Sequence, residues 1–278
     1  MTSVDQLNVE NIVKNSGSSF YWGMKLLPEI QKRAMFSVYA FCRVVDDIAD
    51  NCGTIHSKKV KLNNWKKKIN GLYKKKKINE SILKELKASI KNFDLEKKDF
   101  ISIIDGMLMD VKKKIQFPST SELEKYCKRV AVAVGYLSIK IFGLNDHKGK
   151  KYAYSLGMAF QLTNIVRDFR EDLGIGRCYI PEVKLKKYGI KREITNLEKA
   201  NKIQEVLQEI LGDADDFFKK ADELSINFDK KKIIASELMK EFYKKIHKKM
   251  FKKKINFKKK IKLNFFDKTI ILVNFILR

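Results

Sequence analysis

Two aspartate pairs carry the clearest chemical signature in this sequence. Asp46 and Asp50 lie four residues apart in SVYAFCRVVDDIAD, and Asp168 and Asp172 repeat that spacing in GMAFQLTNIVRDFRED. On a helix, this spacing puts both carboxylates of a pair on one face, where like charges repel and burial penalises both. Carboxylate oxygens bind hard divalent cations, and magnesium also keeps waters and binds substrate phosphate oxygens. The pairs therefore predict two facing helices that hold magnesium beside a phosphate-bearing substrate.

Each pair belongs to a polar stripe on an otherwise apolar helix. On a helical projection the first pair falls, together with Arg43, within about 40° of Tyr39. In the second segment Gln161 and Asn164 share a face with the aspartates, within about 80° of each other. A single D-x-x-x-D pattern usually marks an exposed polar face. Here the carboxylates interrupt apolar helices and the motif occurs twice, which favours a buried site.

The arginines support the same interpretation. By count along the sequence, only eight of the 59 basic residues are arginine. Four of these eight lie close to the aspartates: Arg43, Arg167, Arg170 and Arg177. A planar guanidinium binds a carboxylate or phosphate with two parallel hydrogen bonds, which lysine does poorly. Some of these arginines are expected to bind substrate phosphate, and others to form structural ion pairs.

The elements that position these residues are predicted to be helices. Proline and glycine are scarce and helical periodicity runs nearly throughout, so we expect an all-α fold in one domain spanning residues 1–278. Helices are predicted near residues 5–15, 28–51, 58–75, 79–91, 95–113, 121–142, 148–173, 200–226 and 230–252. Pro28 suits a helix start and Pro118 a break, while Gly174, Gly176 and Pro181 should end the seventh helix.

Composition and charge narrow the class of protein. A net charge of +26 would suit nucleic acid or an anionic membrane, but the lysines occur in runs typical of a compositional bias. Neither a zinc-finger spacing nor an RNP-like segment accompanies them, so we expect no nucleic-acid partner. A basic helical protein that binds nucleic acid or membrane stays open as an alternative of a different class. It would not explain aspartates within apolar helices.

Compartment and membrane topology follow from a few further features. The four cysteines contain no C-x-x-C pair, and the N-terminal segment MTSVDQLNVE has no secretory pattern. The longest apolar run, Ile270 to Leu277, is far shorter than the roughly 20 residues that span a bilayer. We expect a reduced, cytoplasmic protein. The basic segment Lys244 to Lys262 before this apolar tail predicts peripheral contact with anionic membrane.

With these residues in view, the chain resembles the squalene/phytoene synthases. The resemblance covers nearly the whole sequence and is strongest in FCRVVDDIAD, QLTNIVRDFRED and GRCYIP, with weaker support from SGSSFYWGMKLLP, IIDGMLMD and YCKRVAVAVG. It implies the isoprenoid-synthase helical bundle around a central cavity. Within the family, the segment SGSSFY resembles the subgroup that makes presqualene diphosphate in bacterial hopanoid pathways.

The resemblance also implies a role for individual residues. Magnesium would be bound by Asp46, Asp50, Asn164, Asp168 and Asp172. Substrate would be bound by Ser19, Tyr39, Arg43, Gln161, Arg167 and Lys260, and Tyr126 and Tyr243 would lie near the reacting carbons or the departing diphosphate. Alternatives stay open at two of these positions, since Tyr126 also fits a core tyrosine and Ser19 a helix cap. At Lys260 the family often has arginine, so the charge is kept and the bidentate fork is lost.

The implied reaction is the head-to-head condensation of two farnesyl diphosphates to presqualene diphosphate. Phytoene synthase, which condenses two geranylgeranyl diphosphates, is the main alternative. Head-to-tail prenyltransferases would carry two D-D-x-x-D motifs; here residues 46–50 read DDIAD but residues 168–172 read DFRED, so the paired motifs are not present in that form. No dinucleotide fingerprint is present, so NADPH is not expected, and no obligate protein partner is inferred.

Overall fold

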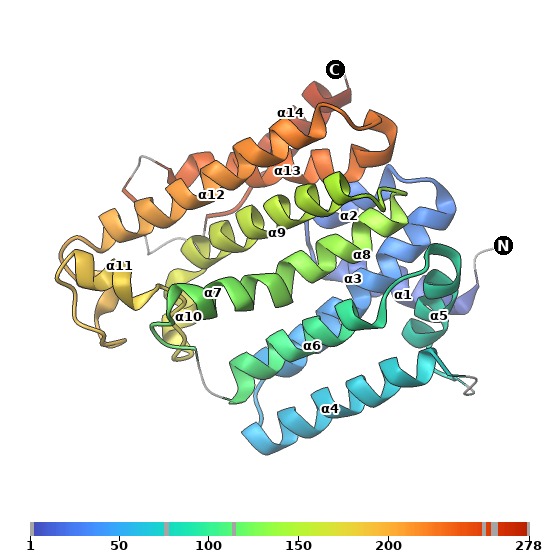
Figure 1. Cartoon of the computed structure of the whole chain (residues 1–278), viewed down its shortest axis with the longest axis horizontal. Coiled ribbons are helices and arrows are strands. Elements are labelled where there is room, and N and C mark those ends of the chain that lie inside the picture. Colours follow the sequence, from blue (N-terminus) through green and yellow to red (C-terminus); the bar gives the residue numbers. More distant parts are fainter. Residues whose placement is uncertain (1–2, 75–77, 113–114, 252–253, 257–260, 277–278) are drawn as a thin grey trace.

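The computed structural model describes residues 3–74, 78–112, 115–251, 254–256 and 261–276, and it confirms the expected all-α architecture (Figure 1). Within these ranges, extended pairing is limited to an isolated bridge between Gln116 and Cys178. The elements are α1 (Val4–Asn15), α2 (Phe20–Lys25), α3 (Glu29–Asp50), α4 (Ile55–Leu72), α5 (Ser81–Phe93), α6 (Lys97–Lys112), α7 (Thr120–Cys127), the π-helical η1 (Lys128–Val132), α8 (Ala133–Ile141), α9 (His147–Arg167), α10 (Phe169–Gly174), α11 (Glu182–Lys187), the 3-10 helix η2 (Leu197–Lys199), α12 (Ile203–Ser225), α13 (Lys230–Met250) and α14 (Phe265–Ile276).

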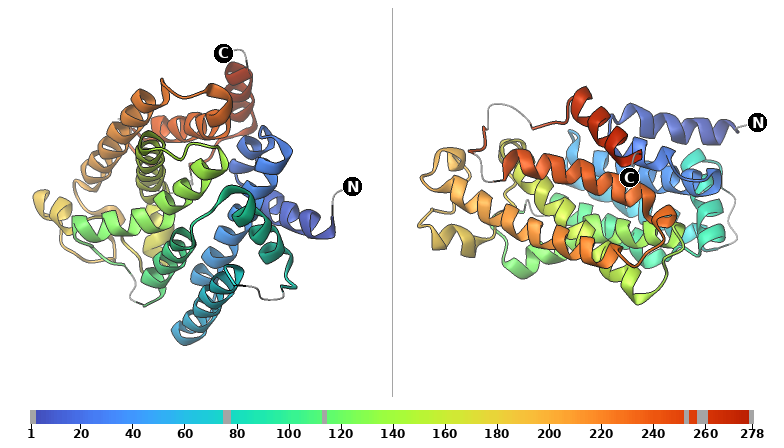
Figure 2. Two further views of the ribbon diagram at one scale, coloured as in Figure 1. Left: turned by 45° about the vertical axis from the view of Figure 1, so that its right-hand side comes forward. Right: turned by 90° about the horizontal axis from the view of Figure 1, so that it is seen from above.

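A ring of helices surrounds the centre of the molecule. Helix α3 packs against α6 and α8, α8 packs against α9, and α9 packs against α13. Helix α2 lies between α13 and α3 and completes the ring. In the left view of Figure 2, α12 and α13 lie on one side of α9, and α4 and α6 on the other. The helices that carry the two aspartate pairs, α3 and α9–α10, therefore face a shared interior.

Local capping sets several helix boundaries. Pro28 directly precedes α3, as its fixed φ favours. Ser119 begins α7 after the break at Pro118, and its side chain accepts from Glu122 N while the Glu122 carboxylate accepts from Ser119 N. The Asp146 side chain accepts from Gly149 N at 2.6 Å and so caps α9.

The single helix predicted for residues 148–173 is interrupted at Asp168. Its backbone angles, φ −98° and ψ 7°, leave the helical region, so α9 ends at Arg167 and α10 begins at Phe169. The bonds Asp168 N to Asn164 O (2.8 Å) and Asp172 N to Asp168 O (2.9 Å) persist across the junction. The predicted helix 148–173 is therefore wrong only at Asp168, where the chain bends. A projection that assumes a straight helix cannot show such a bend.

The helix predicted for residues 121–142 contains the π-helical segment η1, which the periodicity did not indicate. Two glycines on neighbouring helices let this segment pack closely. A Cβ on Gly106 of α6 would lie 2.5 Å from Val130 Cγ1, and a Cβ on Gly157 of α9 would lie 2.8 Å from Val132 Cα. The π-helical segment therefore packs directly against the backbone of α6 and α9 at Gly106 and Gly157, where no side chain intervenes.

Four of the described helices were not predicted at all: α2, α11, η2 and α14. Helices α2 and α11 have six residues each, too few to establish a helical period. Helix α14 covers the apolar tail, and its inner face packs on α13. Among the described residues, no helix combines the length and apolar character required to cross a bilayer.

The glycine contact in the core yields a first prediction. Gly157→Ala should lower the free energy of unfolding by about 1–3 kcal/mol, because the added methyl meets the backbone of Val132, which cannot rotate away. Gly212→Ala on α12 is the matched control, since its Cβ would meet nothing within 4 Å. It should raise stability by up to about 1 kcal/mol. Urea denaturation of both variants tests this, and equal effects would contradict the packing explanation.

Candidate active site

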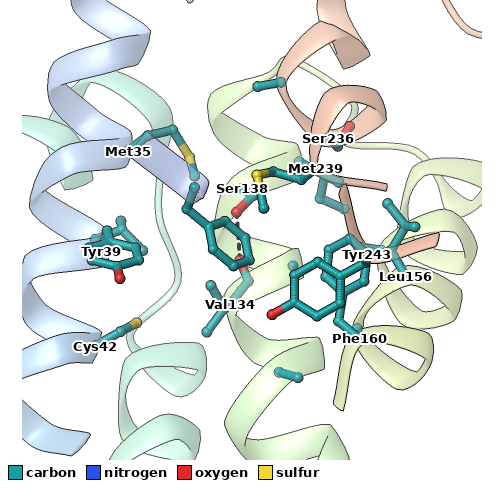
Figure 3. A pocket seen from close by; sticks show the side chains of 18 of the residues that line it. Met35, Tyr39, Cys42, Val134, Ser138, Leu156, Phe160, Ser236, Met239 and Tyr243 are labelled. Carbon is teal, nitrogen blue, oxygen red and sulfur yellow. Dashed lines mark hydrogen bonds between the residues drawn. The ribbon is translucent and has the colours of Figure 1, made fainter. Parts of the chain in front are cut away.

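Two cavities of opposite character meet inside the ring of helices. The polar cavity contains both aspartate pairs and several arginines, whereas the apolar cavity is walled by α2, α3, α8, α9 and α13. The two cavities share five lining residues: Tyr39, Cys42, Val130, Gln161 and Asn164. Figure 3 shows Tyr39 and Cys42 on α3, across the apolar cavity from Phe160 and Tyr243. A ligand with a charged head and an apolar tail would fit across this boundary.

The first aspartate pair lies in the last two turns of α3. Burial, followed by repulsion from Asp50, raises the pKa of Asp46 to about 7. Arg43 was expected beside these carboxylates, and its Nη1 lies 3.7 Å from Asp46 Oδ2. Its closer partner is Asp47, at 2.6 Å from Nη2 to Oδ1, a residue to which the sequence had given no role. Arg43 also lines the polar cavity.

The second pair lies at the junction of α9 and α10. Burial, followed by repulsion from Asp168, raises the pKa of Asp172 to about 8. The charge of Asp50 on α3 raises it further, so the two pairs face each other across the polar cavity. Arg167 donates to Asp168 through Nε at 2.9 Å and through Nη2, which is the two-point contact expected of arginine.

A buried aspartate on α6 extends the site beyond the predicted residues. Asp110 accepts from the Tyr126 hydroxyl at 3.0 Å and from the Tyr179 hydroxyl at 2.8 Å. Arg177 Nη1 lies 2.7 Å from Asp50 Oδ1, and its Nε lies 4.0 Å from Asp110 Oδ1. Burial raises the pKa of Asp110 to about 6, and Arg177 opposes that rise. Arg177 therefore links α3 to this cluster.

Asp110 and Tyr179 were missed as site residues, although both lie in segments that carried the family resemblance. The available signal was an aspartate on the buried face of the predicted helix 95–113, which Asp99 shares, and a tyrosine two residues after Arg177. Tyr126 was predicted near the reacting carbons, with a core tyrosine as the alternative. The structure buries it in the wall of the polar cavity, stacked on Tyr179 with ring centroids 4.8 Å apart.

The other predicted residues differ in where they lie. Tyr243 lines the apolar cavity, where its ring stacks on Phe160 with centroids 4.1 Å apart. Burial raises the pKa of Tyr243, and Arg167 and Asn164 beside its hydroxyl oppose the rise. Ser19 precedes α2, makes no side-chain cap and is not among the described residues that line either cavity. Lys260 lies outside the described residues.

The residues present fit a divalent cation with few protein ligands. Asn164 Oδ1 is buried and accepts no hydrogen bond from the part of the chain that the structure describes. Burial is the main cause of the raised pKa values of Asp46 and Asp172, and repulsion from their pair partners adds to it, so a bound cation would stabilise the charged form of both. In the same described ranges, no three acidic, histidine or cysteine side chains converge as a ready-made metal cluster. This arrangement suits magnesium, which keeps waters and uses substrate phosphate oxygens as ligands.

Comparison with known proteins identifies the family. The profile of the squalene/phytoene synthase family matches residues 13–267. The chain belongs to this family. It is 41% identical over 227 residues to the presqualene diphosphate synthase of Zymomonas mobilis, covering 81% of this chain and 77% of that protein. It is 32% identical over 193 residues to the phytoene synthase of Mycobacterium tuberculosis, covering 69% and 63% of the two chains.

A solved structure supports the same fold. A crystal structure of a dehydrosqualene synthase in complex with a ligand superimposes with a TM-score of 0.81 and 23% identity, covering 98% of this chain and 95% of that one. At this identity the likeness concerns the fold, and it confirms the isoprenoid-synthase bundle expected for a squalene/phytoene synthase.

The two aspartate pairs yield an activity prediction for this squalene/phytoene synthase family member. Asp46→Asn or Asp168→Asn should reduce turnover on the order of 100-fold or more, because each removes a charge aimed at the polar cavity. Asp216→Asn is the control, since that side chain is 79% exposed on α12. Turnover is measured at saturating magnesium. Near-normal turnover in either site variant would contradict the role of the pair.

The raised pKa values yield a pH prediction for the metal-free protein. A carboxyl group loses its proton near pH 3.8 in the unfolded chain, but only near pH 7 at Asp46 and pH 8 at Asp172 in the fold. Both groups therefore destabilise the fold progressively as the pH rises from about 4 to about 8. Relative to wild type, Asp172→Asn should gain melting temperature across this window. If the difference in melting temperature between Asp172→Asn and wild type did not change with pH, the raised pKa of Asp172 would be contradicted.

Proposed function

We propose that this protein condenses two farnesyl diphosphates head to head into presqualene diphosphate. The observation that carries the proposal is the junction of the polar and apolar cavities at Tyr39, Gln161 and Asn164. A diphosphate would lie among the aspartates and arginines, and its prenyl chain would extend into the apolar cavity. The 41% identity to a presqualene diphosphate synthase supports this product over phytoene.

Magnesium is the proposed metal cofactor. The four paired aspartates and Asn164 would hold it, together with waters and diphosphate oxygens. When bound, it would neutralise charge on the departing diphosphate, which is otherwise a poor leaving group. NADPH has no proposed role, because the condensation involves no reduction.

The reaction needs a site that releases diphosphate and protects a cation. One C–O bond breaks with loss of diphosphate, two C–C bonds close a cyclopropane with the second substrate, and one proton is released. Arg43 and Arg167 line the polar cavity and would stabilise the negative charge of the leaving group. The rings of Phe160 and Tyr243 line the apolar cavity, where they would exclude water and stabilise the allylic cation.

The buried hydroxyls beside the polar cavity have a distinct part. Asp110 accepts from the Tyr126 and Tyr179 hydroxyls, and the Tyr126 hydroxyl also lies 3.2 Å from the Tyr179 oxygen, so the three groups hold one another in place. Oxygen lone pairs held in this way would face developing positive charge without needing to reorient. Arg177 offsets the negative charge of Asp110. Its ion pair with Asp50 also connects the Asp110–Tyr126–Tyr179 cluster to α3.

Product analysis tests the proposed reaction. With magnesium and farnesyl diphosphate alone, the purified protein should make presqualene diphosphate, and added NADPH should not change the product. EDTA should abolish turnover. A higher kcat/KM for geranylgeranyl diphosphate would favour the phytoene synthase alternative, and squalene formed only with NADPH would contradict the assigned end product.

We also propose that the protein works in the cytoplasm at an anionic membrane surface, through the outer face of α14. Phe265, Phe266 and Ile270 expose 77%, 74% and 55% of their surface. The inner face is anchored, since Ile271 and Leu272 pack on the α13 cluster. Exposed lysines precede this helix in the chain, among them Lys248, Lys254 and Lys262. An apolar helical face beside positive charge suits a bilayer with acidic headgroups, from which a lipid substrate could enter.

Flotation with anionic vesicles tests the membrane proposal. Wild type should float at low salt and be released at high salt, because each lysine near the surface contributes about 1 kcal/mol. A Phe265→Ser and Phe266→Ser double variant should float less. Ile226→Ser is the control, since Ile226 is 79% exposed at the end of α12, away from α14. Binding that is indifferent to salt or to the phenylalanines would contradict the proposal.

A further inference from the structure

A tyrosine with an unusual support lines the apolar cavity toward the end away from the aspartates. Tyr152 on α9 lines this cavity and is 1% exposed. It lies twelve residues before Asn164, where the apolar and polar cavities meet. Figure 3 shows Met35, Ser138 and Ser236 toward one end of the cavity, with Cys42 and Phe160 toward the other. Tyr152 neighbours the first group, because its hydroxyl lies 2.9 Å from Ser236 Oγ.

The helix that carries both residues gives a length scale for the cavity. Twelve residues of α-helix separate Tyr152 from Asn164 by about 18 Å. An extended farnesyl chain has a length of roughly 14 Å, and one more isoprene unit brings geranylgeranyl to roughly 19 Å, from about 1.25 Å per C–C bond. A C15 chain that starts near Asn164 therefore ends before Tyr152, whereas a C20 chain reaches its ring.

A buried polar network holds the ring of Tyr152 in place. Its hydroxyl donates to Glu237 Oε1 at 2.8 Å, and Lys240 Nζ donates to the same oxygen at 2.7 Å. Lys240 is itself 2% exposed, and its Nζ also lies 2.8 Å from Asp222 Oδ1. The ring packs edge-on against Phe228, with centroids 5.5 Å apart. Moving the ring would cost Glu237, whose side chain is only 23% exposed, one of its two hydrogen bonds, which is unfavourable.

We propose that Tyr152 is the residue that limits the prenyl chain to C15. An aliphatic side chain at the end of a cavity can change rotamer to admit a longer ligand, but a phenol bonded to a partly buried ion pair and packed on Phe228 is held more firmly. This inference rests on the proposed condensation of prenyl diphosphates and specifies its substrate length. Tyr152 acts as a specificity-determining wall and takes no part in the chemistry.

Two variants at Tyr152 distinguish the steric role of its ring from the hydrogen bonds of its hydroxyl. Tyr152→Val removes the ring and should raise the ratio of kcat/KM for geranylgeranyl over farnesyl diphosphate by about tenfold or more, as expected when a pocket gains room for apolar groups. Tyr152→Phe keeps the ring and loses the hydroxyl. It should melt at a lower temperature, with a ratio within about threefold of wild type.

Tyr154→Val is the matched control on the same helix. Tyr154 also bonds a glutamate, Glu124 Oε1 at 2.9 Å, and packs edge-on against Phe217, but it does not line the apolar cavity. Its ratio of kcat/KM values should equal that of wild type. If Tyr152→Val does not fold, as judged by cooperative melting, Tyr152→Leu replaces it and is interpreted in the same way.

The outcomes distinguish the inference from the proposed function. Failure of wild type to convert farnesyl diphosphate would overturn the proposed function itself. If wild type makes presqualene diphosphate and the Val and Leu variants keep the wild-type ratio, only the role of Tyr152 is wrong. An equal shift in Tyr154→Val would also overturn it, because the effect would then follow from general loosening of α9.

Discussion

Repulsion among carboxylates in a half-buried cavity is the constraint on which the rest of this structure depends. Asp46 and Asp172 both have pKa values raised by burial and by their own pair partners, and Asp50 acts on Asp172 from the opposite helix. Such an arrangement is unfavourable for folding and persists only if a large scaffold enforces it. The helices around the apolar cavity supply that scaffold, and they also form the walls that a prenyl chain needs.

Arginine and tyrosine distribute this charge without cancelling it. Arg177 reaches from the irregular connection after α10 to Asp50 and toward Asp110, while Arg167 is held by Asp168. Arg177 therefore offsets Asp50 and Asp110 and Arg167 offsets Asp168, which leaves Asp172 without a guanidinium at ion-pair distance among the contacts that the described residues show. The cavity is poised for a ligand that brings both metal and diphosphate. The adjoining apolar cavity has the character required by the hydrocarbon part of such a ligand.

Much of this site could be predicted from sequence because its strongest signals are local. The first aspartate pair lies on one helix, and the second lies with Gln161 and Asn164 on two helices joined at Asp168 with their hydrogen bonds continuous, so periodicity alone put each set on a shared face. The Asp110–Tyr126–Tyr179 cluster joins α6, α7 and an irregular segment, and no local pattern links them. Similarly, the π-helical turn depends on contact with Gly106 and Gly157, and α14 owes its position to packing on α13. Contacts between distant segments were what the sequence left undetermined.

Calorimetric titration of magnesium, with and without an unreactive farnesyl thiolodiphosphate, tests the central claim most directly. If the two aspartate pairs hold the metal jointly with diphosphate, magnesium should bind weakly to the free protein and tightly once the analogue is present. That gain should be lost in both Asp46→Asn and Asp168→Asn, because each helix contributes one half of the site. Equal magnesium affinity with and without the analogue, or an undiminished gain in either variant, would contradict the account.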